Sequence, residues 1–110
     1  MITLFFLGFI LLTLIIVKLI TFIFRKTVKE YWEGTKILKI KKSICYNPDV
    51  KKWVIEGYVT YYNINGSVGK QLTYINDRLD GVQKYYDNKG KLLEMEIYDF
   101  GTLIHKIKQD

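Results

Sequence analysis

The sequence has very little of several residue types on which common chemistry depends. It contains one cysteine, Cys45, so no disulfide forms within the chain, and one histidine, His105, which excludes a histidine pair or a His-rich metal site. The glycine-rich phosphate-binding patterns G-x-G-x-x-G and G-x-x-x-x-G-K-[ST] do not occur. We therefore predict that the protein is not an enzyme, has no catalytic residues, holds no metal or cofactor, and takes no small-molecule substrate.

What the sequence does have is a long apolar segment at its start. Between Ile2 and Phe24 the only charged residue is Lys18. A helix of this length rises roughly 34 Å, slightly more than the roughly 30 Å hydrocarbon core of a bilayer. The pattern favours an uncleaved transmembrane helix over residues 1–26, with Lys18 reaching toward the Arg25 boundary. The alternatives are an intramembrane ion site at Lys18 and a cleaved signal peptide, although bulky side chains stand where a signal peptidase needs small ones.

Positive charge gathers directly after this segment. The chain has 17 Lys and Arg against 11 Asp and Glu, a net charge of +6, and the excess lies in residues 25–52. Because basic residues beside a membrane segment resist translocation, we predict a single-pass membrane protein whose carboxyl-terminal domain is cytoplasmic. The same cations would contact anionic lipid headgroups, at about 1 kcal/mol each near the surface. The predicted headgroup residues are Arg25, Lys26, Lys29, Lys36, Lys39, Lys41 and Lys42.

The rest of the chain has the two-residue alternation of β-strands. In residues 52–62, Trp53, Ile55, Val59 and Tyr61 fall on one face and other apolar residues on the opposite face. Pro48 lies in an Asn-Pro-Asp turn signal that separates this strand from residues 35–46, so the two segments are predicted to form a hairpin. We therefore expect a juxtamembrane linker over residues 27–34 and an antiparallel β-sheet domain over residues 35–110.

An internal repeat gives the strongest prediction for this domain. Four tyrosines recur at one constant interval, the step from Tyr62 to Tyr74, and glycine shares the period three times. Turn-forming residues follow each tyrosine, and an aliphatic residue follows each turn. The pattern predicts a single antiparallel β-meander with the tyrosines in a ladder along one face. The repeated residues are Tyr62, Tyr74, Tyr86 and Tyr98, with Gly57, Gly69 and Gly81.

The segments 74–92 and 98–103 resemble variants of the MORN repeat (membrane occupation and recognition nexus), as in the YwqK-like antitoxin proteins. The resemblance covers about residues 54–108, and it departs from the pattern where Asp77-Arg78 replaces Asn-Gly and where Leu93 and His105 replace glycines. It implies successive MORN-like hairpins in one elongated sheet. The resulting fold class is mainly β, with one amino-terminal transmembrane α-helix.

Individual residues with reactive side chains are better explained by structure than by catalysis. Glu94 and Glu96 would form an acid/base pair, but solvated positions opposite apolar neighbours are the simpler interpretation. His105 is interpreted as a surface histidine on a strand, and Cys45 as a half-buried strand residue rather than a reactive thiol. Nucleic-acid binding is not expected, because the lysine excess and most of the tyrosines occupy different parts of the chain.

The leading hypothesis is a membrane-anchored MORN-like module that binds another protein, assisted by anionic membrane lipid. Its predicted binding surface is formed by Tyr62, Tyr74, Tyr86 and Tyr98. Packing of the sheet alone is the competing explanation for these tyrosines. An immunity or antitoxin protein that masks a toxin is the alternative function, and it is implied only by the YwqK-like resemblance.

Overall fold

The computed structural model describes residues 2–109, and within its helix it describes the side chains of residues 6–16. The helix α1 (Ile2–Ile23) is followed by eight strands. The strands are β1 (Arg25–Tyr31), β2 (Leu38–Asn47), β3 (Lys52–Tyr62), β4 (Val68–Ile75), β5 (Arg78–Leu79), β6 (Gly81–Tyr86), β7 (Leu92–Asp99) and β8 (Thr102–Lys108).

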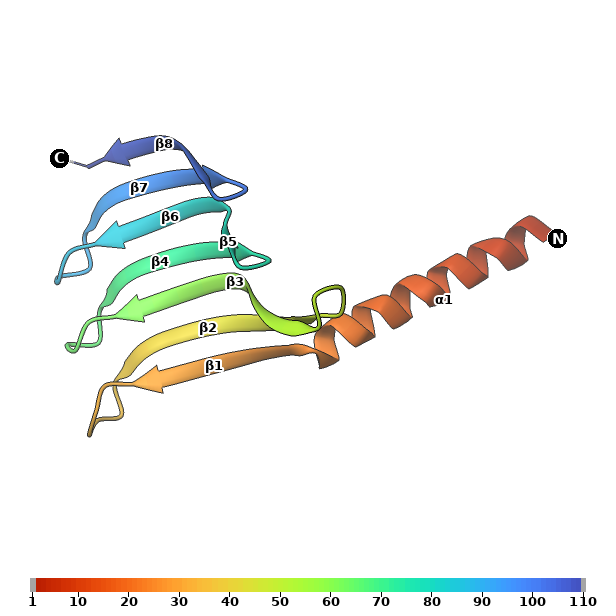
Figure 1. The fold of residues 1–110 in the computed structure, drawn as a ribbon, viewed down its shortest axis with the longest axis horizontal. Coiled ribbons are helices and arrows are strands. Elements are labelled where there is room, and N and C mark those ends of the chain that lie inside the picture. The colour runs from red at the N-terminus through yellow and green to blue at the C-terminus, as the bar shows by residue number, and fades with distance from the viewer. Residues whose placement is uncertain (1, 110) are drawn as a thin grey trace.

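All eight strands belong to one antiparallel sheet. Its order is β1-β2-β3-β4-β6-β7-β8, and the two-residue strand β5 pairs with β4 beside this path. Neighbours in sequence are neighbours in space because short turns join them, and the predicted antiparallel meander is confirmed. The sheet forms a single curved layer, and α1 projects away from it beyond the start of β1 (Figure 1). β1 begins at Arg25, so most of the predicted linker over residues 27–34 lies within the sheet.

The predicted membrane anchor is contradicted. Within the part of the chain that the structure describes, no helix combines the length and the apolar character that membrane crossing requires. This finding overturns the transmembrane helix over residues 1–26 and the single-pass membrane location. The predicted position of the Lys18 side chain lies outside the described residues.

The turns show that the structural repeat spans two tyrosine intervals, from Tyr62 to Tyr86, and not one. At one end of the sheet, the Asn63 amide donates to the Ser67 carbonyl over 2.7 Å, and one such repeat later the Asp87 amide donates to the Lys91 carbonyl over 2.9 Å. At the other end, the turn at Asn76 has two residues with positive φ, and the turn at Phe100 repeats this conformation. Two positive φ angles define the tight type I′ hairpin turn. One repeat is therefore a complete hairpin.

Two strand glycines follow the same hairpin period. Gly57 has a φ of +103° and Gly81 a φ of +91°, and each faces a tyrosine on the next strand, Tyr74 and Tyr98. Residues with a side chain adopt this backbone conformation only under strain. Gly69, which shares the tyrosine interval in the sequence, has no positive φ. Gly69 therefore does not supply the positive φ that Gly57 and Gly81 contribute to each hairpin.

The buried core of the sheet is small. Among the described residues, the buried apolar side chains are Val54, Val59 and Leu72, and the most deeply buried side chain is the polar Gln83, at 0% exposure. The Gln83 amide replaces missing strand pairing between β4 and β6. Its oxygen accepts from the Thr73 amide, and its nitrogen donates to the carbonyls of Thr73 and Gly81 at 3.2 Å. A side chain thus holds these two strands together where their backbones separate.

Candidate binding site

The strand register separates the side chains into two faces of the sheet. Directly paired residues share a face, and alternate residues of one strand point to opposite faces. On one face, Tyr61 is opposite Lys70, which is opposite Tyr85, and Tyr74 and Tyr98 point to this face from further along β4 and β7. We call this the tyrosine face. The other face carries the row Lys41, Thr60, Gln71, Lys84 and Met95, and we call it the groove face.

The tyrosine face is packed around acidic residues. Glu94 forms an ion pair with Lys106, with 2.8 Å between Oε1 and Nζ, and Lys70 lies over the Tyr61 ring at 4.4 Å. Burial raises the pKa of Tyr74, and the nearby Tyr61 and Asp77 add to this effect. The pKa of Tyr85 is raised further, by burial, by a hydrogen bond to Glu96 and by the charge of that carboxylate. These side chains, most of them half-buried, stabilise one another along the sheet from β3 to β8.

Replacing Tyr85 with phenylalanine is expected to weaken the alkaline pH dependence of stability. The raised pKa of Tyr85 favours the protonated phenol in the folded state, so this contribution is complete below the ordinary value of 10.0 and is lost as pH rises through the folded value. The free energy of unfolding in urea, measured at several pH values on both sides of 10.0, should fall less steeply for Tyr85→Phe than for the parent protein.

The matched control for this prediction is Tyr31→Phe, because Tyr31 is an exposed residue of β1 outside the tyrosine face. This variant should keep the alkaline dependence of the parent protein. If Tyr85→Phe retains the same dependence as well, the interaction between Tyr85 and Glu96 does not contribute to stability.

The four tyrosines predicted as a binding surface do not form one ladder. Successive strands run in opposite directions, so one step of the interval moves a tyrosine to the opposite end of the sheet. Tyr74 and Tyr98 lie on the tyrosine face beside the type I′ turns. Tyr62 and Tyr86 follow irregularities in the register at the other end, and Tyr62 lines the groove. The residues that join Tyr74 and Tyr98 on this face are Tyr61 and Tyr85, which lie one position before Tyr62 and Tyr86 in the sequence.

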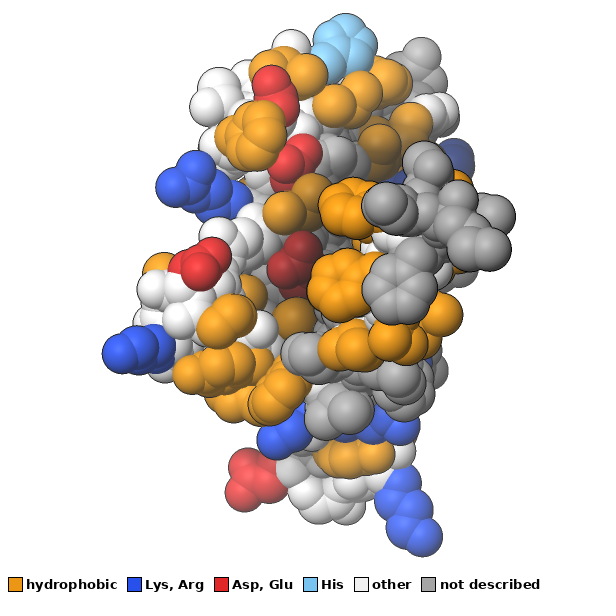
Figure 2. Space-filling model, turned by 90° about the vertical axis from the view of Figure 1, so that its right-hand side faces the viewer, with side chains coloured by type: hydrophobic (Ala, Val, Ile, Leu, Met, Phe, Trp, Pro, Cys, Tyr) orange, Lys and Arg blue, Asp and Glu red, His pale blue; other side chains and the backbone are white. Residues whose placement is uncertain are grey.

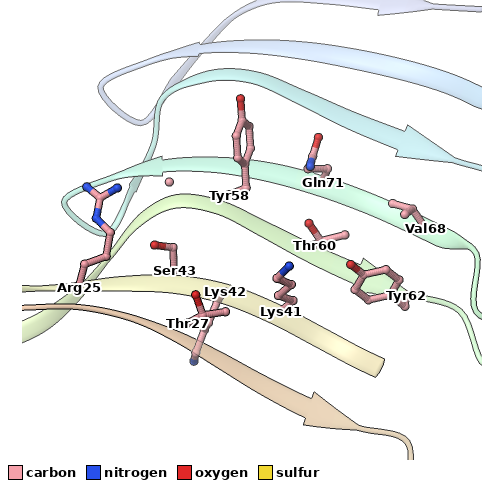
Figure 3. Close-up of a pocket in the computed structure, with 11 residues that line it drawn as sticks. Arg25, Thr27, Lys41, Lys42, Ser43, Tyr58, Thr60, Tyr62, Val68 and Gln71 are labelled. Carbon is pink, nitrogen blue, oxygen red and sulfur yellow. The ribbon is translucent and has the colours of Figure 1, made fainter. Parts of the chain in front are cut away.

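The groove face contains an open groove of about 510 Å³ that crosses β1 to β4 (Figure 3). Its lining is polar in the middle and basic at β1 and β2, and it contains no carboxylate. Tyr58 stands above β3 beside Gln71 of β4, and both side chains border the same opening (Figure 3). The lining residues are Arg25, Thr27, Lys41, Lys42, Ser43, Gly57, Tyr58, Thr60, Tyr62, Val68 and Gln71.

The predicted lipid-headgroup residues are divided between different environments. Arg25, Lys41 and Lys42 line the groove, although Lys41 and Lys42 project to opposite sides of β2 (Figure 3). Lys26 lies over the Trp53 ring at 4.4 Å and Lys39 over the Trp32 ring at 5.0 Å. Lys29 is opposite Lys41, and Lys36 lies in the loop between β1 and β2. By the strand register Lys29 and Lys41 share the groove face, whereas Lys42 projects to the other side of β2, so these cations do not all lie on one surface, and lipid contact stays a prediction.

An apolar patch adjoins the groove on the same face. We define it by Val82 of β6 and by Met95 and Ile97 of β7, which point to one side of the sheet, together with the neighbouring exposed Leu93 of β7. Val82 and Leu93 are 43% and 46% exposed. Figure 2 views the molecule from the end that carries α1, so the hydrophobic side chains seen there include those of α1 as well as those of the sheet. Large apolar side chains exposed together are typical of interaction surfaces.

The other reactive residues have structural roles, although two glutamates are not solvated as expected. Cys45 is half-buried in β2 and His105 is exposed on β8, which confirms the interpretation of both as strand residues. Glu94 and Glu96 were expected to be solvated, but both are half-buried and engaged with Lys106 and Tyr85. Within the described part of the chain, His, Cys, Asp and Glu residues form no group of three that could hold a metal ion.

Comparisons of this chain with families of proteins, with curated proteins and with solved structures found no match. The MORN-like resemblance therefore stays a prediction, and the fold itself provides the basis for a functional argument.

Proposed function

We propose that this chain is a protein-binding module and that its groove face is the surface that docks the partner. The observation that carries this proposal is the exposure of the apolar patch on a single-layer sheet. A sheet normally buries its apolar side chains against a second layer. In this molecule no other described element covers either face, and α1 points away from the sheet (Figure 1).

The difference between the two faces supports the choice of the groove face. On the tyrosine face, the side chains of neighbouring strands satisfy one another through an ion pair, a hydrogen bond and a cation–π contact. On the groove face, Tyr58 is 62% exposed and the apolar patch lies open beside it. Covering exposed apolar surface yields roughly 25 cal/mol per Å² before the costs of association, so a partner gains more from the groove face.

Placing charges in the apolar patch is expected to abolish partner capture. The double variant Val82→Lys with Leu93→Lys should recover at least about tenfold less partner than the parent chain, because two buried ammonium groups oppose docking. The experiment is affinity capture with the full chain as bait, followed by quantitative mass spectrometry. Circular dichroism spectra should show that the double variant keeps its β-sheet.

The matched control is Ile64→Lys, since Ile64 is equally apolar and 62% exposed but lies in the turn between β3 and β4. It should capture the same partners as the parent chain. Unchanged capture by a folded double variant would remove the apolar patch from the proposal, and an equal loss from Ile64→Lys would show that added charge acts nonspecifically. The antitoxin role implied by the MORN-like resemblance stays a prediction.

A further inference from the structure

We infer that the groove binds a phosphomonoester group carried by a segment of the partner protein. This inference deepens the proposed function and rests on it for the nature of the partner. The argument uses the charge of the groove, its hydroxyl groups, and its position beside the apolar patch.

The charge of the groove favours an anion. Arg25 and Lys41 extend into it from neighbouring strands (Figure 3), and no carboxylate lies in its lining. The ion pairs found among the described residues, Lys52 with Asp77 and Lys106 with Glu94, lie outside the groove. Its positive charge is therefore uncompensated, which repels a cationic occupant and attracts a negatively charged one.

The hydroxyl groups of the groove favour phosphate over carboxylate. Thr27 is directly opposite Ser43, and Lys41 is directly opposite Thr60, so the strands place three hydroxyl residues and one lysine together in the lining of the groove. A phosphomonoester presents three acceptor oxygens and nearly two negative charges, whereas a carboxylate presents two oxygens and one charge. The planar fork of an arginine also matches a phosphate through two parallel hydrogen bonds. The number and type of donors therefore suit the larger, more highly charged group.

The setting of the groove favours a protein segment as the carrier of the phosphate. A space of about 510 Å³ is much larger than one phosphate, so the rest of the ligand also lies along the strands. Tyr58 of β3 lines the groove and is opposite Thr73 of β4, whose hydroxyl donates to the Val82 carbonyl over 2.9 Å. The surface is thus continuous from the basic groove to the apolar patch. A phosphorylated side chain in a segment with apolar neighbours matches both parts.

The test is a nuclear magnetic resonance titration of the full chain in a non-ionic detergent. The probe is a short glycine- and serine-flanked peptide that contains one phosphoserine, compared with its unphosphorylated twin. We expect the phosphorylated peptide alone to shift the amide signals of Thr27, Ser43 and Thr60. Arg25→Gln and Lys41→Gln should each weaken its affinity about tenfold, the loss of one charge-assisted contact. Equal binding of the unphosphorylated twin would overturn the inference.

The matched control variant is Lys36→Gln, which removes the same charge from the loop between β1 and β2, outside the groove. It should leave the affinity for the phosphorylated peptide unchanged. If Lys36→Gln weakens binding as much as Lys41→Gln, the contact is diffuse attraction to a basic chain, and the groove is not a site.

A second comparison distinguishes a protein from a lipid as the source of the phosphate. Phosphatidylcholine vesicles with and without phosphatidic acid are offered to the same variants. Binding to phosphatidic acid that requires Arg25 and Lys41, with no response to the peptide, would overturn the assignment to a protein segment.

The peptide titration and the capture experiment can fail separately. If the chain binds the phosphopeptide but the double variant Val82→Lys with Leu93→Lys still captures the partners, this inference stands and the proposed docking surface is refuted. If the chain does not bind the phosphopeptide but capture still depends on the apolar patch, only this inference is refuted.

Discussion

Replacing Gln83 with methionine is expected to lower the free energy of unfolding by about 3 kcal/mol, because the amide and carbonyl groups of Thr73 lose their buried partner. Methionine has nearly the same length and an apolar end, so the change removes hydrogen bonds and leaves little empty space. Equilibrium unfolding in urea measures the effect. The loss is large for so small a domain, since whole domains are stable by only about 5–15 kcal/mol.

The matched control is Gln71→Met on the neighbouring strand β4. Gln71 lies in the groove and is half-buried, whereas Gln83 is fully enclosed. We expect Gln71→Met to change the stability by less than about 1 kcal/mol, as is usual for a surface substitution. Equal losses in the two variants would mean that the Gln83 amide has no special role in joining β4 to β6.

Replacing Gly57 with alanine is expected to cost about 2 kcal/mol of stability, because a φ of +103° is strained for any residue that has a Cβ atom. The added Cβ would lie 3.5 Å from the Cβ of Ser43, an ordinary contact, so the expected cost comes from the backbone and not from crowding. Unfolding in urea again gives the measurement. The equivalent change Gly81→Ala should cost about the same amount, since Gly81 has a similar φ in the next repeat.

The contrasting variant is Gly69→Ala, because Gly69 has no positive φ. Its added Cβ would meet the Asn63 Oδ1 atom at 3.0 Å, and that atom belongs to a side chain that can move. A smaller loss than for Gly57→Ala is therefore expected. Similar losses at all three glycines would contradict the hairpin repeat and favour a repeat of one tyrosine interval.

The sequence predicts the path of the chain better than the orientation of its side chains. Alternation in residues 52–62 and the turn at Pro48 correctly predict the β2–β3 hairpin. The spacing of Tyr62 and Tyr74 correctly predicts regular reversals of the backbone. It does not show that the register shifts between Tyr61 and Tyr62, which determines the side-chain directions after that point. A register irregularity changes hydrogen bonding at one residue and has no periodic signature.

The candidate site is harder to predict for a related reason. The groove combines Arg25 from a segment interpreted as the end of an anchor with Thr60 and Gln71 from distant strands. Single threonines and serines in strands are common, and only the pairing of β1 with β2 and of β2 with β3 brings their hydroxyls together. The buried Gln83 is equally inconspicuous, because the gap that it fills arises from the divergence of β4 and β6. Strand alternation does, however, place the apolar Met95 and Ile97 on the face opposite Glu94 and Glu96.

The hairpin repeat also limits how such a chain can change in length. Each strand contacts only the strands beside it, so the sheet has no centre that all repeats must share. Removal of one whole hairpin takes away a pair of strands and one turn of each kind, and it leaves the following strand with its original direction and outward side. Removal of half a hairpin would reverse every later strand and exchange the ends at which the tight turns lie. Growth or shortening by whole hairpins would therefore preserve this architecture, and a surface spread over several strands could widen without disturbing its existing part.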